Sequence, residues 1–268
     1  MQEMLIIGEK LNSAIPSVRQ IINDKNAAAV QDLARRQAEA GADYLDLNTA
    51  HCDEVADMEW LVRTVQEVTD VPLCIDSTAG EAIKKGLETV KGDKSKVIIN
   101  SISMEKKRLE EVLPLVLEYQ CPVIGLTVDD NGIPKTAEER IKITEGLIET
   151  LSRKNYDLSN LYIDPLVLPL AVNHTNAVMF FQCLRDIKRL FKVKTVSGLS
   201  NISFNMPKRK LINRYFLTIC MASGMDAAIL DPLDGKIMTA VTTTDLLLGN
   251  DRFGKNFLKA YRKDLLAD

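Results

Sequence analysis

The sequence predicts an α/β fold, a single (β/α)8 TIM barrel built from eight strand–helix units. Short apolar runs rich in Val, Ile and Leu alternate with amphipathic stretches along the whole chain, as expected when buried parallel strands are joined by crossover helices. This unit occurs eight times. The length of 268 residues and the 46% hydrophobic content are typical of one such barrel with a filled core. We therefore expect one domain over residues 1–268.

The elements can be assigned in chain order. The stretches between strands carry apolar stripes at helical spacing, one from Met58 to Val68 and another from Leu109 to Leu117, and both are expected to pack on the sheet. Loops are short, and no charge run or low-complexity stretch marks a linker. The expected strands are short and span Met4–Lys10, Tyr44–Asn48, Pro72–Asp76, Lys96–Ser101, Pro122–Val128, Leu161–Leu166, Lys194–Ser200 and Ala227–Asp231.

A doubly wound open sheet would also give alternating strands and helices. Such a sheet would normally carry a Gly-rich phosphate turn after its first strand. The segment Gly8-Glu9-Lys10-Leu11-Asn12 holds a single glycine at that place. Dinucleotide binding therefore has little support, and eight units favour closure into a barrel.

Composition narrows the classes of partner. Lys and Arg number 34 against 37 Asp and Glu, a net charge of -3 that offers no basic surface to nucleic acid. The five cysteines form no C-x-x-C pair, and no apolar run approaches the roughly 20 residues that span a bilayer. The segment Met1–Gly8 runs directly into an expected strand rather than a signal peptide. We expect a cytoplasmic protein with no nucleic-acid or membrane partner.

In α/β barrels the active site lies at the C-terminal ends of the strands. Here these ends carry carboxylates, carboxamides and hydroxyls, and no lysine, cysteine or histidine closes strands two to eight. A covalent nucleophile is therefore not evident. The residues at the strand ends are Glu9, Asn12, Asp46, Asn48, Asp76, Ser77, Thr78, Asn100, Ser101, Thr127, Asp164, Ser200, Asn201 and Asp231.

Two kinds of ligand are compatible with this ring. Several carboxylates could hold a divalent metal, but such sites commonly add histidines, and the chain has only His51 and His174 without partner spacing. Each histidine is better interpreted as a solvated or capping residue, so no metal is expected. Asp and Asn side chains also complement a flat heterocycle with adjacent N–H donors and ring acceptors. The pterin ring fits this description, and so do purines.

Six segments that contain these strand ends form a recognisable series: Ile7–Asn12, Gly41–Asn48, Ile75–Thr78, Ile99–Ser101, Tyr162–Leu166 and Gly198–Ser203. In this order they resemble the methyltetrahydrofolate:corrinoid protein methyltransferases of anaerobic bacteria and the folate domain of cobalamin-dependent methionine synthase. The similarity runs through nearly the whole chain. It departs at Lys10, where arginine is common, and at Phe204, where relatives from acetogens tend to carry a polar residue.

The resemblance implies a folate site in the barrel mouth. Alternatives from the residues alone remain open: Asp76 and Asp164 are also typical helix N-caps, Asn201 also suits a turn, and Lys208 and Lys210 read better as a surface turn. The implied substrate-binding residues are Asp76, Asn100 and Asp164 on the pterin edge, Gly198 and Ser200 in the pocket wall, Asn201 beside the methyl-bearing nitrogen, Arg209 on the folate, and Asn48 more weakly.

The resemblance also implies an activity. A methyl group would move, in either direction, between 5-methyltetrahydrofolate or tetrahydrofolate and the cobalt of a corrinoid (cobalamin), in anaerobic one-carbon metabolism. Asn201 would be the catalytic residue, through a hydrogen bond to the methyl-bearing nitrogen. No corrinoid-binding motif occurs in the chain, so the cobalt would arrive on a partner corrinoid protein or free. The resemblance further implies a homodimer.

Two alternatives share the pterin pocket. Dihydropteroate synthase has the same fold but uses a lysine–arginine cluster around its seventh and eighth strands. This chain has Gly198-Leu199-Ser200-Asn201 after strand seven and Asp231-Pro232 after strand eight. A non-catalytic folate-binding protein would keep Asp76, Asn100 and Asp164, so only activity separates it from the methyltransferase.

Overall fold

The strands close into a parallel barrel. The computed structural model describes residues 3–267, so the first two residues of the expected run from Met1 into the first strand lie outside the described residues. Each strand pairs with its neighbours in chain order, and β1 also pairs with β8, which leaves the sheet without a free edge. The strands are β1 (Leu5–Asn12), β2 (Tyr44–Asn48), β3 (Leu73–Asp76), β4 (Ile98–Met104), β5 (Val123–Asp129), β6 (Leu161–Asp164), β7 (Lys194–Gly198) and β8 (Ala227–Leu230).

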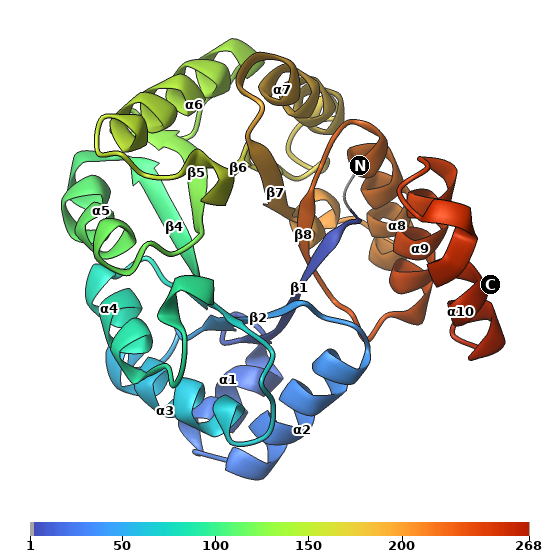
Figure 1. Ribbon diagram of the computed structural model, residues 1–268, viewed down its shortest axis with the longest axis horizontal. Helices are drawn as coiled ribbons and strands as arrows, with labels where there is room; N and C mark the ends of the chain where they lie inside the picture. Colours follow the sequence, from blue (N-terminus) through green and yellow to red (C-terminus); the bar gives the residue numbers. More distant parts are fainter. Residues whose placement is uncertain (1–2, 268) are drawn as a thin grey trace.

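The helices form a ring around these strands (Figure 1). Two helices, α1 and α2, connect β1 to β2, and α10 follows α9 at the end of the chain. The helices are α1 (Pro16–Asn23), α2 (Ala27–Glu39), α3 (Glu54–Gln66), α4 (Gly80–Thr89), α5 (Lys106–Tyr119), α6 (Ala137–Ser152), α7 (Asn176–Phe191), α8 (Arg209–Ala222), α9 (Gly235–Leu247) and α10 (Lys255–Arg262). The barrel expected from the sequence is confirmed.

Some strand ends differ from those expected. β6 ends at Asp164 rather than Leu166, because Leu166 adopts a left-handed backbone with φ 63° that leaves the sheet. β7 ends at Gly198 rather than Ser200, because a short 3-10 helix, η3, begins at Leu199 and runs to Ser203. Both departures lie at the C-terminal end of the barrel, where the chain turns to form loops.

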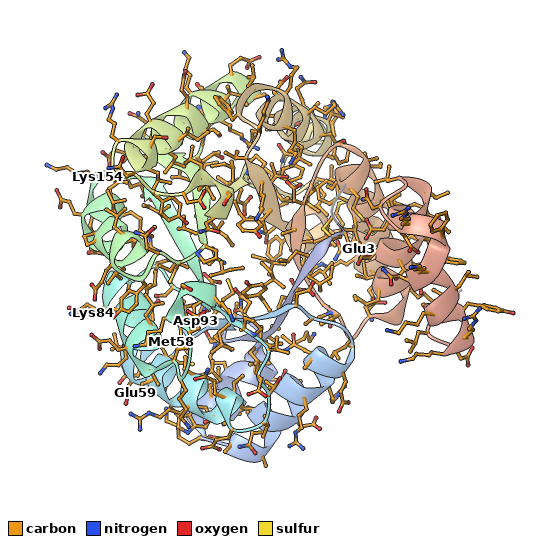
Figure 2. All side chains as sticks on the ribbon, viewed as in Figure 1. Glu3, Met58, Glu59, Lys84, Asp93 and Lys154 are labelled. Atoms are coloured by element: carbon orange, nitrogen blue, oxygen red, sulfur yellow. The ribbon has the colours of Figure 1, made fainter. Side chains whose placement is uncertain are left out.

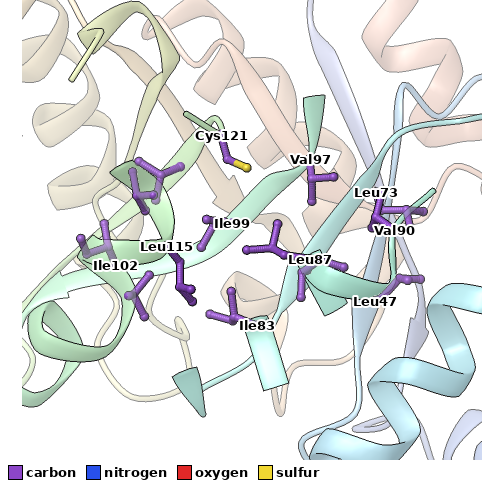
Figure 3. Packing of buried hydrophobic residues seen from close by; sticks show 14 of the residues in the cluster. Leu47, Leu73, Ile83, Leu87, Val90, Val97, Ile99, Ile102, Leu115 and Cys121 are labelled. Carbon is purple, nitrogen blue, oxygen red and sulfur yellow. The ribbon is translucent and has the colours of Figure 1, made fainter. Parts of the chain in front are cut away.

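The main core lies between the outer face of the sheet and the helices. Leu47, Leu73 and Ile99 from the strands pack with Ile83 and Leu87 of α4 in one cluster (Figure 3). The apolar stripe expected from Met58 to Val68 faces this core, as does the stripe from Leu109 to Leu117. On the outside, Lys84 and Lys154 point away from the barrel at the periphery (Figure 2). The alternation read from the sequence therefore corresponds to one buried and one solvated face per helix.

A second cluster fills the inside of the barrel. Side chains alternate between the two faces of a strand, so every second residue of a barrel strand points inward. These inward residues form a separate apolar cluster from seven strands: Ile7, Cys74, Ile98, Ile124, Tyr162, Val196 and Ala227. The next inward layer towards the C-terminal end begins at Asp46, Asp76, Asn100 and Asp164, so the apolar cluster forms the floor beneath them.

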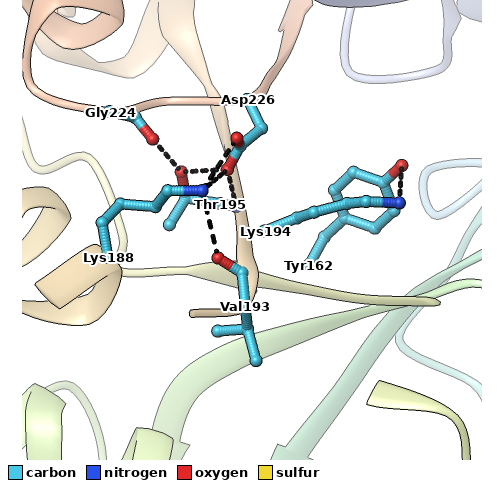
Figure 4. A network of polar contacts seen from close by, with 7 residues as sticks. All are labelled: Tyr162, Lys188, Val193, Lys194, Thr195, Gly224 and Asp226. Carbon is cyan, nitrogen blue, oxygen red and sulfur yellow. Dashed lines mark hydrogen bonds and ion pairs between the residues drawn. The ribbon is translucent and has the colours of Figure 1, made fainter. Parts of the chain in front are cut away.

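A network of polar contacts joins segments at the opposite, N-terminal end of the barrel (Figure 4). Lys188 donates to both carboxylate oxygens of Asp226 at 2.9 Å and to the carbonyl of Val193 at 3.3 Å. Asp226 also accepts from the backbone N–H of Thr195 at 2.7 Å. These contacts tie α7 to the segments that lead into β7 and β8. No helix within residues 3–267 is both long and apolar enough to cross a membrane.

Candidate active site

A cavity of about 730 Å³ opens at the C-terminal mouth of the barrel. This volume lies in the range of small-molecule sites. Residues from β1 to β8 and from the loops that follow them line it. The lining residues are Glu9, Lys10, Asn12, Ala14, Ile15, Asp46, Asp76, Asn100, Leu126, Asp164, Leu166, Gly198, Leu199, Ser200, Asn201, Arg209, Lys210, Asn213, Ile229, Leu230, Asp231, Asp234 and Ile237.

The Asp164 carboxylate is held by one of its two oxygens. Oδ1 accepts a 2.5 Å hydrogen bond from the Ser197 hydroxyl and a 2.8 Å bond from the backbone N–H of Leu166. Oδ2 accepts none from residues 3–267. The side chain is therefore fixed in orientation while one acceptor faces the cavity.

Asp76 is held in the same way from the other side. The amide nitrogen of Asn48 donates a 2.9 Å hydrogen bond to Oδ2 of Asp76, and no described residue donates to Oδ1. Asn48 and Asp76 are register partners on β2 and β3. The mouth thus presents two carboxylates, each with one oxygen tied to protein and one available to a ligand.

Burial sets the protonation of both carboxyls. It raises the pKa of Asp76 and that of Asp164 to about 6. Hydrogen bonds from Asn48 and Ser197 oppose this effect, as do the positive charges of Arg108 and Arg140, because all of them favour the charged form. Both carboxyls are consequently ionised at neutral pH and lie close enough to their pKa values to respond to mild acid.

Asp46 lines the cavity in the layer directly above the apolar floor. Its side chain is 1% exposed, and Oδ1 has no hydrogen-bond partner within the described chain. Burial, reinforced by the charge of Asp76, raises the pKa of Asp46 well above its usual value. Asp46 therefore holds a proton more tightly than a solvent-exposed aspartate does.

The loop after β7 forms the opposite wall. The Ser200 hydroxyl donates to Oε1 of Glu9 at 2.8 Å, which links this loop to β1. Arg209 donates through Nε to the Ser203 hydroxyl at 3.1 Å and through Nη2 to the carbonyl of Ser200 at 2.9 Å. Asn201, between these anchors, is exposed, and its side-chain amide makes no hydrogen bond with residues 3–267. Hydrogen bonds thus hold the loop at Ser200 and Ser203, on either side of the unbonded Asn201 carboxamide.

Ion pairs cross the rim of the mouth. Lys10 pairs with Asp231 at 3.1 Å, and Lys210 pairs with Asp234 at 3.3 Å. Lys210 lines the cavity, whereas Lys208 does not. Within residues 3–267 no group of three His, Cys, Asp or Glu side chains is arranged to hold a metal ion.

The structure brings seven of the eight expected site residues to one cavity. Asn48 is the exception, since it lies behind Asp76 and does not line the cavity. Ser197 donates to Asp164 but was not expected, because it lies within β7 rather than at its end. Glu9 and Asp46 were recognised as strand-end residues without an assigned contact, and both line the cavity.

Comparison with known proteins identifies the family of the chain. The family model described as pterin binding enzyme matches residues 10–231. A methylcorrinoid:tetrahydrofolate methyltransferase from Eubacterium limosum is 38% identical over 97% of this chain and 97% of that protein. The methionine synthase of Mycobacterium tuberculosis is 31% identical over 84% of this chain, which corresponds to 20% of that longer protein.

Solved structures share the fold at lower identity. A dihydropteroate synthase from Xanthomonas albilineans in complex with 7,8-dihydropteroate superposes with a TM-score of 0.73 at 17% identity, over 92% of this chain and 94% of that chain. At this identity the likeness shows the fold alone. The family match and the full-length relative carry the assignment further: the chain belongs to the pterin-binding enzyme family, among the methyltransferases represented by the Eubacterium limosum protein.

Proposed function

We propose that this chain is a methyltransferase that moves a methyl group between 5-methyltetrahydrofolate and the cobalt of a corrinoid carried by another protein. One observation carries the proposal: the two half-free carboxylates of Asp76 and Asp164 share one cavity in a chain that is 38% identical to a methylcorrinoid:tetrahydrofolate methyltransferase over nearly its whole length. The reaction is reversible in principle, so the proposal covers both directions.

The polar set of the mouth suits the edge of a pterin. The free oxygens of Asp76 and Asp164 accept hydrogen bonds, which matches the amino and N–H groups of that ring. Asn100, 9% exposed between them in strand order, both donates and accepts. Gly198 and Ser200 form the wall, and Arg209 holds the loop that carries them. The pterin would therefore bind with its donor edge towards the β3, β4 and β6 ends.

Asn201 is the proposed catalytic residue. Displacement of the methyl group from the pterin nitrogen requires that nitrogen to gain a proton or a hydrogen bond, since it is otherwise a poor leaving group. Only an interaction that strengthens in the transition state accelerates this step. The carboxamide of Asn201 has no protein partner among residues 3–267, so it is free to donate to the nitrogen. In the proposed step a proton from solvent is held on the pterin nitrogen by the hydrogen bond from Asn201. The methyl carbon would bond to Co(I) to give methyl-Co(III), and the electron pair of the broken C–N bond would stay on the nitrogen of tetrahydrofolate, which keeps the proton.

The proposal extends to the state of the protein and its partners. The corrinoid protein would dock on the mouth, because the cobalt must reach the methyl group there. A cytoplasmic homodimer is also proposed. Support for the dimer comes from α8, where Leu211, Tyr215 and Ile219 lie on one face at a spacing of four residues and are 47%, 63% and 46% exposed.

The decisive experiment measures transfer directly. The purified protein is mixed with 5-methyltetrahydrofolate and photoreduced Co(I) cobalamin, and the absorption spectrum of methylcobalamin is followed; the reverse reaction starts from methylcobalamin and tetrahydrofolate. We expect transfer in both assays, and Asn201→Ala supplies a matched variant with an intact pterin pocket. Folate binding by calorimetry without transfer in either assay would instead identify a non-catalytic folate-binding protein.

A further inference from the structure

The two carboxylates of the mouth share an arrangement that extends beyond the cavity. Arg108, in the first turn of α5, donates to the carbonyls of Ser77 at 2.5 Å and Thr78 at 2.8 Å. These are the two residues that follow Asp76. A buried arginine thus binds the backbone of the loop that follows Asp76.

Arg140, in the first turn of α6, repeats the pattern at the other carboxylate. Its Nη1 donates to the carbonyls of Pro165 at 2.5 Å and Leu166 at 2.9 Å, the two residues that follow Asp164. A capping box formed by Thr136 and Glu139 starts α6 immediately before Arg140. The capping box therefore fixes the start of α6 and, with it, the position of Arg140 beside these carbonyls.

We propose that Arg108 and Arg140 are positioning residues for folate binding, which act through the backbone of the loops after β3 and β6 to hold Asp76 and Asp164 in their ligand-accepting orientation. The inference deepens the proposed function and rests on it. Neither arginine touches the cavity.

The burial of both arginines indicates that they have a specific role. Arg108 is 9% exposed and Arg140 is fully buried, and a buried guanidinium is costly unless it is well paired. Arg140 even leaves Nε and Nη2 buried without a partner among residues 3–267. Neither arginine forms an ion pair with its neighbouring aspartate within that range. A direct pair would occupy the carboxylate, whereas the route through backbone carbonyls leaves one oxygen free for the ligand.

The strained geometry after β6 shows what is held. Leu166 has φ 63°, an unfavourable backbone for a branched residue, and in that conformation its N–H donates to Oδ1 of Asp164. Arg140 binds the carbonyl of this same residue. The arginine therefore stabilises the conformation that orients the carboxylate.

The charges supply a second effect. Each guanidinium lowers the pKa of its aspartate against the effect of burial. Asp164 also faces the Ser197 hydroxyl, while Asp76 faces Asn48, Glu54 and Asp46. Glu54, Glu105 and Glu111 in turn face Arg108, and Cys183 of α7 faces Arg140.

The test combines charge-removing and charge-keeping variants. Arg140→Met and Arg108→Met are expected to weaken folate binding by about tenfold or more, the size expected for losing a charge-assisted hydrogen bond, with little change in turnover at saturating folate. Arg140→Lys and Arg108→Lys keep the charge, but the lysine nitrogen ends about one bond short of the guanidinium Nη atoms and lacks the two-nitrogen fork of Arg108. Folate affinity should therefore fall while the pH midpoint of binding stays. Arg153→Met, at the exposed end of α6, is the control.

A measurement without ligand separates this inference from the proposed function. Titration of the aspartate carboxyls by ¹³C NMR in the folate-free protein should show the pKa of Asp164 above about 6 in Arg140→Met and close to that value in Arg140→Lys. If the methionine variants do not fold, the lysine variants decide. Wild-type folate affinity in the lysine variants would overturn the proposal, and so would an Asp164 pKa that is the same in Arg140→Met as in the wild type. Absence of folate binding in the wild type would overturn the proposed function instead.

Discussion

The amide nitrogen of Asn48 lies 2.9 Å from Oδ2 of Asp76 and donates a hydrogen bond to it. The orientation of this amide is determined, because its oxygen accepts from the Ser13 hydroxyl at 3.2 Å and from the backbone N–H of Ala50 at 3.1 Å. Only the nitrogen can face Asp76. We therefore expect Asn48 to act on the site through Asp76.

Replacing Asn48 should weaken folate binding through Asp76. In Asn48→Ala the carboxylate loses a donor, and we expect affinity to fall about tenfold, as for the loss of one hydrogen bond to a charged group. Asn48→Asp should cost more, because it places a second carboxylate beside Asp76. Calorimetry at pH about 7.5 measures both, with Asn23→Ala at the exposed end of α1 as control. Equal folate affinity in Asn48→Ala, Asn48→Asp and Asn23→Ala would show that Asn48 has no role in folate binding.

Asn201→Ala should act on turnover rather than on affinity. Removal of one preorganised donor typically costs about 10²–10³-fold in rate. We expect this loss in the methylcobalamin assay at saturating folate, with a folate dissociation constant close to that of the wild type. An unchanged rate would show that another group serves the pterin nitrogen.

Mild acid should weaken folate binding and favour the fold. The N–H donors of a pterin need ionised acceptors, so affinity should fall as the pH drops through about 6, the raised pKa of Asp76 and Asp164. The same raised pKa values mean that the folded state binds these protons more tightly than the unfolded chain. Their contribution to stability is fully present below the unfolded value of 3.8 and is lost as the pH rises through about 6.

Calorimetry and thermal unfolding across this pH window measure the two effects on the same preparations. Asp164→Asn removes one of the carboxyls, so it should bind folate weakly at every pH and show a shallower pH dependence. A normal dissociation constant in Asp164→Asn would argue against its pterin role.

Gly198→Ala should narrow the cavity without disturbing the fold. Gly198 has φ -70°, which any residue adopts, and a Cβ there would lie 3.8 Å from Nδ2 of Asn201. We expect weaker folate binding and an unchanged melting temperature. Gly125→Ala is the contrasting variant, since its Cβ would meet the buried Leu147 side chain at 3.1 Å. It should lower the melting temperature and leave folate affinity intact.

The exposed face of α8 predicts the oligomeric state. Tyr215→Lys and Ile219→Glu place charges on the apolar stripe, which would be buried in the proposed homodimer. Light scattering coupled to gel filtration should report a dimer for the wild type and a monomer for both variants. A monomeric wild type, or a dimer that survives both changes, would show that α8 is not the interface.

The barrel and the ring of polar residues in its mouth could be predicted from the sequence because both follow from local patterns. Alternation of apolar runs and amphipathic stretches specifies the strands, and in a closed parallel barrel every strand end meets at one mouth. Asp76, Asn100 and Asp164 could therefore be placed together without a structure.

The supporting residues could not be predicted in the same way. Ser197 reads as one more residue of β7, and Arg108 reads as part of a basic helix start, Lys106-Lys107-Arg108. Arg140 lies among charged residues of α6, and nothing in its neighbours shows that it is buried. Their roles depend on which loop each side chain meets across the barrel, and that is settled only by three-dimensional packing.

The apolar floor formed by Ile7, Cys74, Ile98, Ile124, Tyr162, Val196 and Ala227 has a kinetic consequence. It blocks the barrel axis below the cavity, so in the proposed reaction folate and cobalt would use the same entrance. A docked corrinoid protein would then trap the folate beneath it. Steady-state kinetics should accordingly be ordered, with folate binding first and leaving last, and excess corrinoid protein should inhibit by covering the empty mouth.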